Sequence, residues 1–262
     1  MSALFSLQGK TIVITGGAGL LGSEFTRVCI QHGARVVIVE LHEEKAKSLI
    51  ASVRKEIKTA EILFVKCDIT KEKDIQNVLI KTIREYKNID VLINNAYPRN
   101  AHYGRNMEDV TYEDFCNNLN MHAGGYFLMT KKVIEVMRKQ KKGNIINIAS
   151  IYGILGPDFR IYKNTPMTMP IEYAAIKGAI VNMTKYFSTY AASYGIRVNS
   201  ISPGGIFTDQ PASFVKKYCE RVPLGRMAKT KDIVGGVIYL ASDASSYITG
   251  QNLMIDGGLS VW

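Results

Sequence analysis

Residues 11–22 read Thr-Ile-Val-Ile-Thr-Gly-Gly-Ala-Gly-Leu-Leu-Gly, an apolar run that passes directly into a glycine-rich turn. The helical pattern that follows ends near His32-Gly33, so a strand, a turn and a helix come in immediate succession. Glycines let such a turn close, and they let the backbone approach a pyrophosphate, whose charge then lies at the helix N-terminus. The stretch predicts a dinucleotide site, with Gly16, Gly19 and Leu21 as candidate contacts.

Six further strand-like runs alternate with helical patterns along the rest of the chain, at Val36–Glu40, Ile62–Val65, Val91–Asn94, Asn144–Ala149, Arg197–Ser202 and Asn252–Ile255. The segments between them are long enough for crossover helices, which parallel pairing requires. The runs lack clean polar alternation, as expected of strands that are covered on both faces. An amphipathic pattern at Lys71–Tyr86 is typical of a covering helix. We therefore predict an α/β fold, a doubly wound parallel sheet of about seven strands with helices on both faces.

The composition is that of an ordinary globular protein, with 47% hydrophobic and 21% charged residues among 262. No Pro/Gly-rich linker or repeat divides the chain, so residues 1–262 are predicted to form a single domain. The first residues show no secretory signal, and no apolar run is long enough to span a membrane. Cysteine spacing predicts reduced thiols rather than a metal site or disulfides, and hence a cytoplasmic protein: Cys29, Cys67, Cys116 and Cys219 lie far apart.

The formal net charge of +10, with a pI near 9.3, raises the possibility of nucleic acid or an acidic partner. However, Lys and Arg are spread over the whole length, and clusters such as Lys139–Lys142 fall where helices are expected to end. Basic residues near a helix C-terminus suit the helix dipole, so solvated helix faces are the favoured interpretation. We expect a small-molecule substrate and no nucleic acid or membrane partner.

Acidic residues end the second and third predicted strands. Glu40 lies 24 residues beyond Gly16, where a carboxylate can bind the adenine ribose and repel a 2′-phosphate, which favours NAD over NADP. Alternatively, Glu40 merely begins the next helix. Asp68 is expected near the adenine edge, although helix capping by Asp68 or Thr70 is an equally simple role. Their neighbours are also candidate cofactor contacts, Leu41 and Ile69.

Five separated motifs together resemble the short-chain dehydrogenase/reductase family over essentially the whole length. They are the glycine turn, Asn94-Asn95-Ala96, Ser150, Tyr173-Ala174-Ala175-Ile176-Lys177 and Ser202-Pro203-Gly204-Gly205-Ile206-Phe207-Thr208. The C-terminal segment from Ile248 to Gly258 is similar to the family's as well. The resemblance implies a Rossmann-type sheet. It also implies that the cofactor's ribose and nicotinamide are flanked by Asn95, Ala96, Tyr97, Pro203, Gly204, Ile206 and Thr208.

The spacing of Tyr173 and Lys177 carries the expected chemistry. Hydride transfer at a carbinol carbon needs a proton to leave or join the oxygen, and a phenol with a pKa of about 10 is a poor base at neutral pH. A lysine at i+4 lies on the same helix face and can stabilise the tyrosinate. Ser150 would bind the substrate oxygen, and in the family the lysine also holds the nicotinamide ribose. By itself, such a Tyr and Lys pair is more typical of a solvated helix face, but together with Ser150 and the glycine turn it favours the catalytic interpretation.

Three positions depart from the family's pattern. Leu20 stands where many members have a third glycine, and Tyr97 replaces the glycine of Asn-Ala-Gly. An ungapped comparison puts His122 on the family's proton-relay asparagine, where an imidazole could relay through water near neutral pH. A local shift that restores Asn120 to that position is the competing interpretation.

Three irregular segments follow predicted strands and are expected to line the substrate site, residues 97–110, 151–170 and 204–225. Ser150 and Tyr173 are farther apart than is usual in the family, owing to Ile154–Pro170, which we interpret as a lid or wall. Five basic residues in these segments predict a basic crevice, although they could equally serve solubility: Arg99, His102, Arg105, Arg160 and Lys163.

We expect an NAD-dependent oxidoreductase that interconverts a secondary alcohol and a ketone on a polar sugar or sugar phosphate. Pro98-Arg99-Asn100 and the approach Asn164–Tyr173 are similar to flagellin-modification and surface-sugar proteins of the family. One alternative is a 3-oxoacyl-carrier-protein reductase, against which Glu40 argues because that activity usually draws on NADPH. Another is a non-catalytic dinucleotide-sensing or nucleic-acid-binding protein, which would not need Ser150, Tyr173 and Lys177.

The sequence also predicts assembly into a homotetramer or homodimer. This rests on two long apolar helices, expected at Phe115–Met137 and Ala174–Ala192, and on the family resemblance of Pro223–Trp262.

Overall fold

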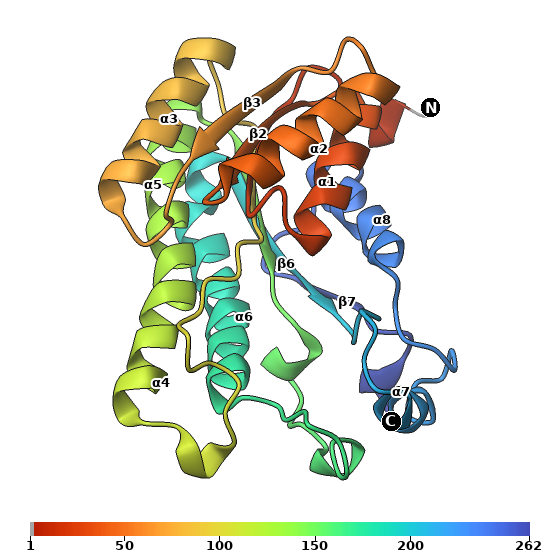
Figure 1. Cartoon of the computed structure of the whole chain (residues 1–262). Helices are drawn as coiled ribbons and strands as arrows, with labels where there is room; N and C mark the ends of the chain where they lie inside the picture. The colour runs from red at the N-terminus through yellow and green to blue at the C-terminus, as the bar shows by residue number, and fades with distance from the viewer. Residues whose placement is uncertain (1–2) are drawn as a thin grey trace.

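A computed structural model describes residues 3–262, and its centre is a seven-stranded parallel sheet (Figure 1). The strand order is β3-β2-β1-β4-β5-β6-β7. The strands are β1 (Thr11–Thr15), β2 (Arg35–Glu40), β3 (Ile62–Lys66), β4 (Val91–Asn94), β5 (Gly143–Ile148), β6 (Ile196–Pro203) and β7 (Asn252–Ile255). The predicted doubly wound sheet is confirmed, and no strand boundary differs from its predicted position by more than one residue.

Helices cover both faces of the sheet (Figure 1). One face carries α1 (Leu20–Gln31), α2 (Glu43–Glu56) and α8 (Thr230–Ala241), and the other carries α3 (Glu72–Tyr86), α5 (Gly125–Gln140) and α6 (Ile171–Ala191). Beyond the carboxyl ends of the strands lie α4 (Tyr112–Leu119) and α7 (Ala212–Cys219). Short 3-10 turns occupy Ala3–Phe5, Met107–Asp109, Ile151–Gly153, Phe159–Ile161, Ala192–Tyr194, Asp243–Ser245 and Leu259–Val261.

Two apolar cores, one on each face, hold the layers together. All five residues of β1 are buried, and their side chains alternate between the faces: Val13 joins the core under α3, α5 and α6, whereas Ile14 joins the core under α1, α2 and α8. This explains why the strand sequences show no polar alternation. Ile75 and Val78, on the apolar stripe of α3, are fully buried as its period predicts.

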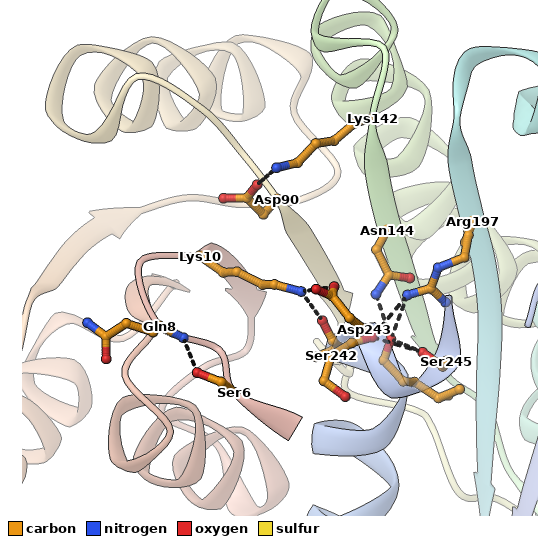
Figure 2. Close-up of polar contacts among 12 residues, drawn as sticks. Ser6, Gln8, Lys10, Asp90, Lys142, Asn144, Arg197, Ser242, Asp243 and Ser245 are labelled. Carbon is orange, nitrogen blue, oxygen red and sulfur yellow. Dashed lines mark hydrogen bonds and ion pairs between the residues drawn. The ribbon is translucent and has the colours of Figure 1, made fainter. Parts of the chain in front are cut away.

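A polar network closes the end of the sheet at which the strands begin (Figure 2). Lys10, just before β1, donates to Asp243 at 2.7 Å, and Lys142, just before β5, lies 3.1 Å from Asp90. The side chains of Asn144 and Arg197 both donate to the main-chain carbonyl of Leu240 in the last turn of α8, at 2.6 and 3.2 Å. These contacts tie loops to strand starts, and they leave the opposite edge for the cavity described below.

The helix predicted at Phe115–Met137 is interrupted. A π-helical turn at Asn120–Gly124 joins α4 to α5. A π-turn contains one residue more than an α-helical turn, so it changes which side chains face the sheet. Within this turn His122 is fully buried and Asn120 is exposed. In the described part of the chain, no helix is both long and apolar enough to cross a membrane.

Candidate active site

A cavity of about 1030 Å³ opens at the carboxyl ends of the strands. It lies where β1 is flanked by β2 on one side and β4 on the other, so the chain runs outward in opposite directions from this point. In open α/β sheets, ligands bind at this topological switch point. All of the cofactor-contact candidates from the sequence line the cavity: Gly16, Gly19, Leu21, Glu40, Leu41, Asp68, Ile69, Asn95, Ala96, Tyr97, Tyr173, Lys177, Pro203, Gly204, Ile206 and Thr208.

The glycine turn forms the floor at the end of β1. Gly16 has φ +62°, and a Cβ built there would lie 2.9 Å from the Cα of Ala96, so the position requires glycine. A Cβ at Gly22 would overlap the carbonyl oxygen of Gly16. Asn95 fixes this arrangement, because its side-chain amide donates to the carbonyl of Gly16 at 3.1 Å. Leu20, the departure from the family's pattern, begins α1 with an exposed side chain and does not obstruct the turn.

Glu40 ends β2 with a largely buried carboxylate. Its Oε1 accepts hydrogen bonds from the backbone N–H of Leu41 at 2.9 Å and of His42 at 3.2 Å. The helix α2 begins only at Glu43, so Glu40 is not a helical residue, but it does orient the chain that enters the helix. His42 and Lys45 also line this end of the cavity, and sequence reasoning missed both.

Asp68 combines the two roles considered for it. Its Oδ1 accepts from the backbone N–H and the hydroxyl of Thr70, at 3.0 and 2.7 Å, and thereby shapes the turn before α3. Asp68 also lines the cavity. The structural role therefore does not remove it from the site.

Ser150, Tyr173 and Lys177 meet in the middle of the cavity. Ser150 lies two residues after the end of β5, and its Oγ accepts from the backbone N–H of Tyr152 at 3.2 Å. The first turn of α6 presents Tyr173, and the next turn presents Lys177 on the same side. The Lys177 amine donates to the carbonyl of Ile148 at 2.8 Å and lies 5.5 Å from the centre of the Tyr173 ring.

Burial sets the protonation of this group. Burial raises the pKa of Tyr173 above its ordinary value, and the polar contact with Ser150 opposes that rise. Burial also lowers the pKa of Lys177 to about 7. The pKa of Tyr173 in the free protein is thus raised rather than lowered as expected, because desolvation disfavours the charged forms of both side chains. At neutral pH the Tyr173 side chain is a phenol with a proton to donate.

His122 does not line the cavity; it lies behind Tyr97, which does. Its ring is 5.1 Å, centre to centre, from both Tyr97 and Tyr126. Burial, and secondarily the charge of Lys177, lowers the pKa of His122 well below its usual range. Neither ring nitrogen has a hydrogen-bond partner among residues 3–262. The structure thus brings His122, not the exposed Asn120, close to the site.

Tyr97 occupies the place of the family's glycine and forms part of the cavity wall. Its hydroxyl lies 2.6 Å from that of Tyr103, and its ring meets that of Tyr173 edge-on at 5.9 Å. A phenol is thereby held beside the candidate catalytic tyrosine.

Of the five basic residues considered for the crevice, Arg99 lines the cavity and the other four do not, which favours the solubility interpretation for those four. His102 and Arg105 lie 2.9 and 3.6 Å from Asp114 instead, and Arg160 pairs with Asp158. Aromatic and thioether side chains supply much of the wall, and the sequence did not single them out: Tyr103, Tyr152, Tyr162, Met167, Met169, Phe214, Tyr218 and Met227. All but Met227 come from the three predicted loops.

Within residues 3–262, no cluster of three His, Cys, Asp or Glu side chains could hold a metal ion.

Known proteins resemble this chain along almost its full length. A family model described as enoyl-(acyl carrier protein) reductase matches residues 18–260. Post-translational flagellin modification protein A of Campylobacter coli is 31% identical over 253 residues, which cover 96% of this chain and 98% of that protein. A 3-oxoacyl-[acyl-carrier-protein] reductase of Thermotoga maritima is 36% identical over 265 residues, covering 97% and 99%. A crystal structure of a short-chain dehydrogenase from Leptospira borgpetersenii with bound NAD+ has a TM-score of 0.85 at 37% identity, covering 97% and 94%.

Proposed function

The chain belongs to the short-chain dehydrogenase/reductase family of NAD(P)-dependent oxidoreductases, and we propose that it interconverts a secondary alcohol and a ketone with NAD(H). The observation that carries the proposal is that Ser150, Tyr173 and Lys177 line the same cavity as the glycine turn. A proton donor, an oxygen-binding hydroxyl and a dinucleotide cradle are the parts that this chemistry requires.

Tyr173 is the acid/base in this proposal. A nicotinamide dinucleotide, when bound, supplies or accepts the hydride. In the reducing direction Tyr173 donates its phenolic proton to the carbonyl oxygen, while the Ser150 hydroxyl binds that oxygen and stabilises the negative charge developing on it. A raised tyrosine pKa suits this direction because it keeps the proton in place at neutral pH. In the oxidising direction, Lys177 stabilises the tyrosinate that accepts the proton.

His122 is proposed to relay protons to Ser150, Tyr173 and Lys177 through water, since neither of its ring nitrogens contacts a hydrogen-bonding group of residues 3–262 directly. Its burial keeps the imidazole neutral, so that one ring nitrogen can donate while the other accepts. The exposure of Asn120 supports His122 in this role over the shifted alternative.

We assign the cofactor preference to Glu40. Its Oε1 is held by backbone N–H groups, and no hydrogen bond from residues 3–262 reaches Oε2, which could accept from a ribose hydroxyl. A 2′-phosphate beside this largely buried carboxylate would be repelled. The other fifteen cavity-lining candidates named from the sequence would hold the remainder of the dinucleotide.

The proposed substrate is a polar, sugar-like ring, because several tyrosine side chains line the cavity and the chain resembles a flagellin modification protein. A 3-oxoacyl-carrier-protein reductase is the second candidate, supported by the Thermotoga maritima relative. A turnover screen separates the two: absorbance of the reduced cofactor is followed with sugars, sugar derivatives and a 3-oxoacyl thioester, each with NADH and NADPH. We expect NADH oxidation with a sugar-like ketone. Cofactor binding without turnover would instead favour a dinucleotide sensor.

We further propose that residues 1–262 act as one domain and that the protein assembles as a homotetramer or homodimer. Exposed aromatic side chains on α5 and α6 support assembly, among them Phe127 and Tyr190. The free cysteines support a reducing compartment such as the cytoplasm.

A further inference from the structure

Arg99 lines the cavity beside Tyr97 and Tyr103, with a side chain that is exposed to solvent. Its guanidinium lies 5.2 Å from the ring centre of Tyr97 and 5.9 Å from that of Tyr103. The hydroxyl of Tyr97 in turn lies 2.6 Å from that of Tyr103. Stacking on aromatic faces orients a guanidinium while leaving its outer N–H groups available.

The charge of Arg99 has no counter-ion in the described part of the chain. No carboxylate oxygen of residues 3–262 lies within 4.0 Å of it, whereas Arg105, on the same loop, is paired with Asp114. The other cationic side chains of the cavity lie elsewhere: Lys45 lies beside Glu40 at the nucleotide end, and Lys177 donates to a main-chain carbonyl. The substrate end therefore carries a single open positive charge.

The rest of this end of the cavity presents ring faces and thioethers. The hydroxyls of Tyr152 and Tyr162 lie 3.2 Å apart and partner each other, and the Tyr218 hydroxyl accepts from the backbone N–H of Gly205. The Tyr218 hydroxyl and one hydroxyl of the Tyr152 and Tyr162 pair each keep a proton to donate, so this end offers two O–H donors among aromatic rings and thioethers. Such walls fit a hydroxylated ring, and Arg99 fits one anionic substituent on it.

We propose that the substrate carries one carboxylate, bound by Arg99, and is a hydroxy or keto ring carboxylate of the sugar-acid type rather than a sugar phosphate. The planar guanidinium matches the two oxygens of a carboxylate. A phosphate monoester carries about 1.5 to 2 negative charges at neutral pH and would call for a second cation, which this end lacks. The inference rests on the proposed function. The carboxylate takes no part in the hydride and proton transfers.

The test uses three achiral ketones that differ in one substituent: 4-oxocyclohexanecarboxylate, its carboxamide and 4-oxocyclohexyl phosphate. Each is titrated into the NADH-loaded protein, with binding followed by cofactor fluorescence and reduction by loss of absorbance. NADH affinity is measured first for the unmodified protein, Arg99→Gln and the control Arg105→Gln. Arg105 has the same charge on the same loop but is paired with Asp114 and does not line the cavity.

A charge-assisted hydrogen bond is worth enough for about a tenfold or greater preference for the carboxylate over the carboxamide. We expect that preference in the unmodified protein and in Arg105→Gln, and its loss in Arg99→Gln at unchanged NADH affinity. Absence of a carboxylate preference, tighter binding of the phosphate, or weaker NADH binding by Arg99→Gln would each overturn the inference. Failure of every variant to bind NADH would contradict the proposed function itself, and the first titration shows this before any ketone is added.

Discussion

The amine of Lys177 lies 5.5 Å from the ring centre of Tyr173 and is anchored by a 2.8 Å hydrogen bond to the end of β5. Both side chains belong to one face of α6, so a rigid helix and a central strand fix their separation. Burial acts on the two in opposite senses, raising the pKa of the phenol and lowering that of the amine to about 7. The free protein therefore holds a protonated acid beside an amine that titrates near neutral pH.

The Lys177 shift predicts how stability depends on pH. An unfolded lysine has a pKa of about 10.4, so between pH 7 and 10 the unfolded chain binds more protons than the folded one. The free energy of unfolding should rise with pH across this window, by a few kcal/mol from this residue, since one pKa unit corresponds to about 1.4 kcal/mol. Denaturant unfolding of cofactor-free Lys177→Met should lack that rise, whereas Lys185→Met, exposed on the same helix, should keep it. Parallel pH dependences in all three proteins would contradict the prediction.

Replacing Glu40 should change cofactor choice. Glu40→Ala should lower the ratio of kcat/KM with NADH to that with NADPH by roughly tenfold or more, and Glu40→Arg should move it further, because repulsion of the 2′-phosphate is removed or reversed. The matched control is Glu44→Ala, which removes an exposed charge that pairs with Lys47. Equal use of NADPH by the unmodified protein would refute the assignment.

Assembly should depend on the aromatic side chains of α5 and α6. Phe127 is 46% exposed and Tyr190 is 52% exposed, and Tyr190 stacks on Tyr186 at 6.2 Å. We expect a dimeric or tetrameric mass at micromolar concentration, shifted toward the monomer in Phe127→Glu/Tyr190→Glu. Ile80→Glu, which changes an exposed apolar residue on α3, should leave the mass unaltered. Analytical ultracentrifugation measures all three, and a monomeric unmodified protein would exclude the predicted assembly.

The sheet was predictable because each strand is marked by the residues of its own short segment. Runs such as Thr-Ile-Val-Ile-Thr bury both of their faces. The segments between the runs are long enough for the crossover helices that parallel strands require. The switch point then brings the turn after β1 and the ends of β4 and β5 together wherever this topology forms. That is why the cofactor-contact candidates and Ser150, which lie far apart in sequence, line one cavity.

The charge of the crevice was not predictable, because it depends on which carboxylate each basic side chain meets in the folded loops. Asp158 binds both its neighbour Arg160 and the distant Arg221, and Asp114 binds His102 and Arg105 across a loop. A sequence shows the cations but not these partners.

The π-turn was equally hidden. The residues of Asn120–Gly124 fit an ordinary helical period, and only packing shows which side chain the extra residue buries. The sequence therefore left His122 and Asn120 as alternatives, whereas the structure distinguishes their positions.

Replacement of Tyr173 by phenylalanine tests the acid/base assignment most directly. The change removes the transferable proton and keeps the ring that packs against Tyr97. The measurement is the rate of NADH oxidation in a single turnover, with saturating NADH and a ketone that the unmodified protein reduces, alongside NADH affinity. The account predicts a rate lower by about 10² to 10⁴, the usual contribution of a general acid, with NADH affinity nearly unchanged. A near-normal rate in Tyr173→Phe would leave the fold standing and would contradict Tyr173 as the proton donor.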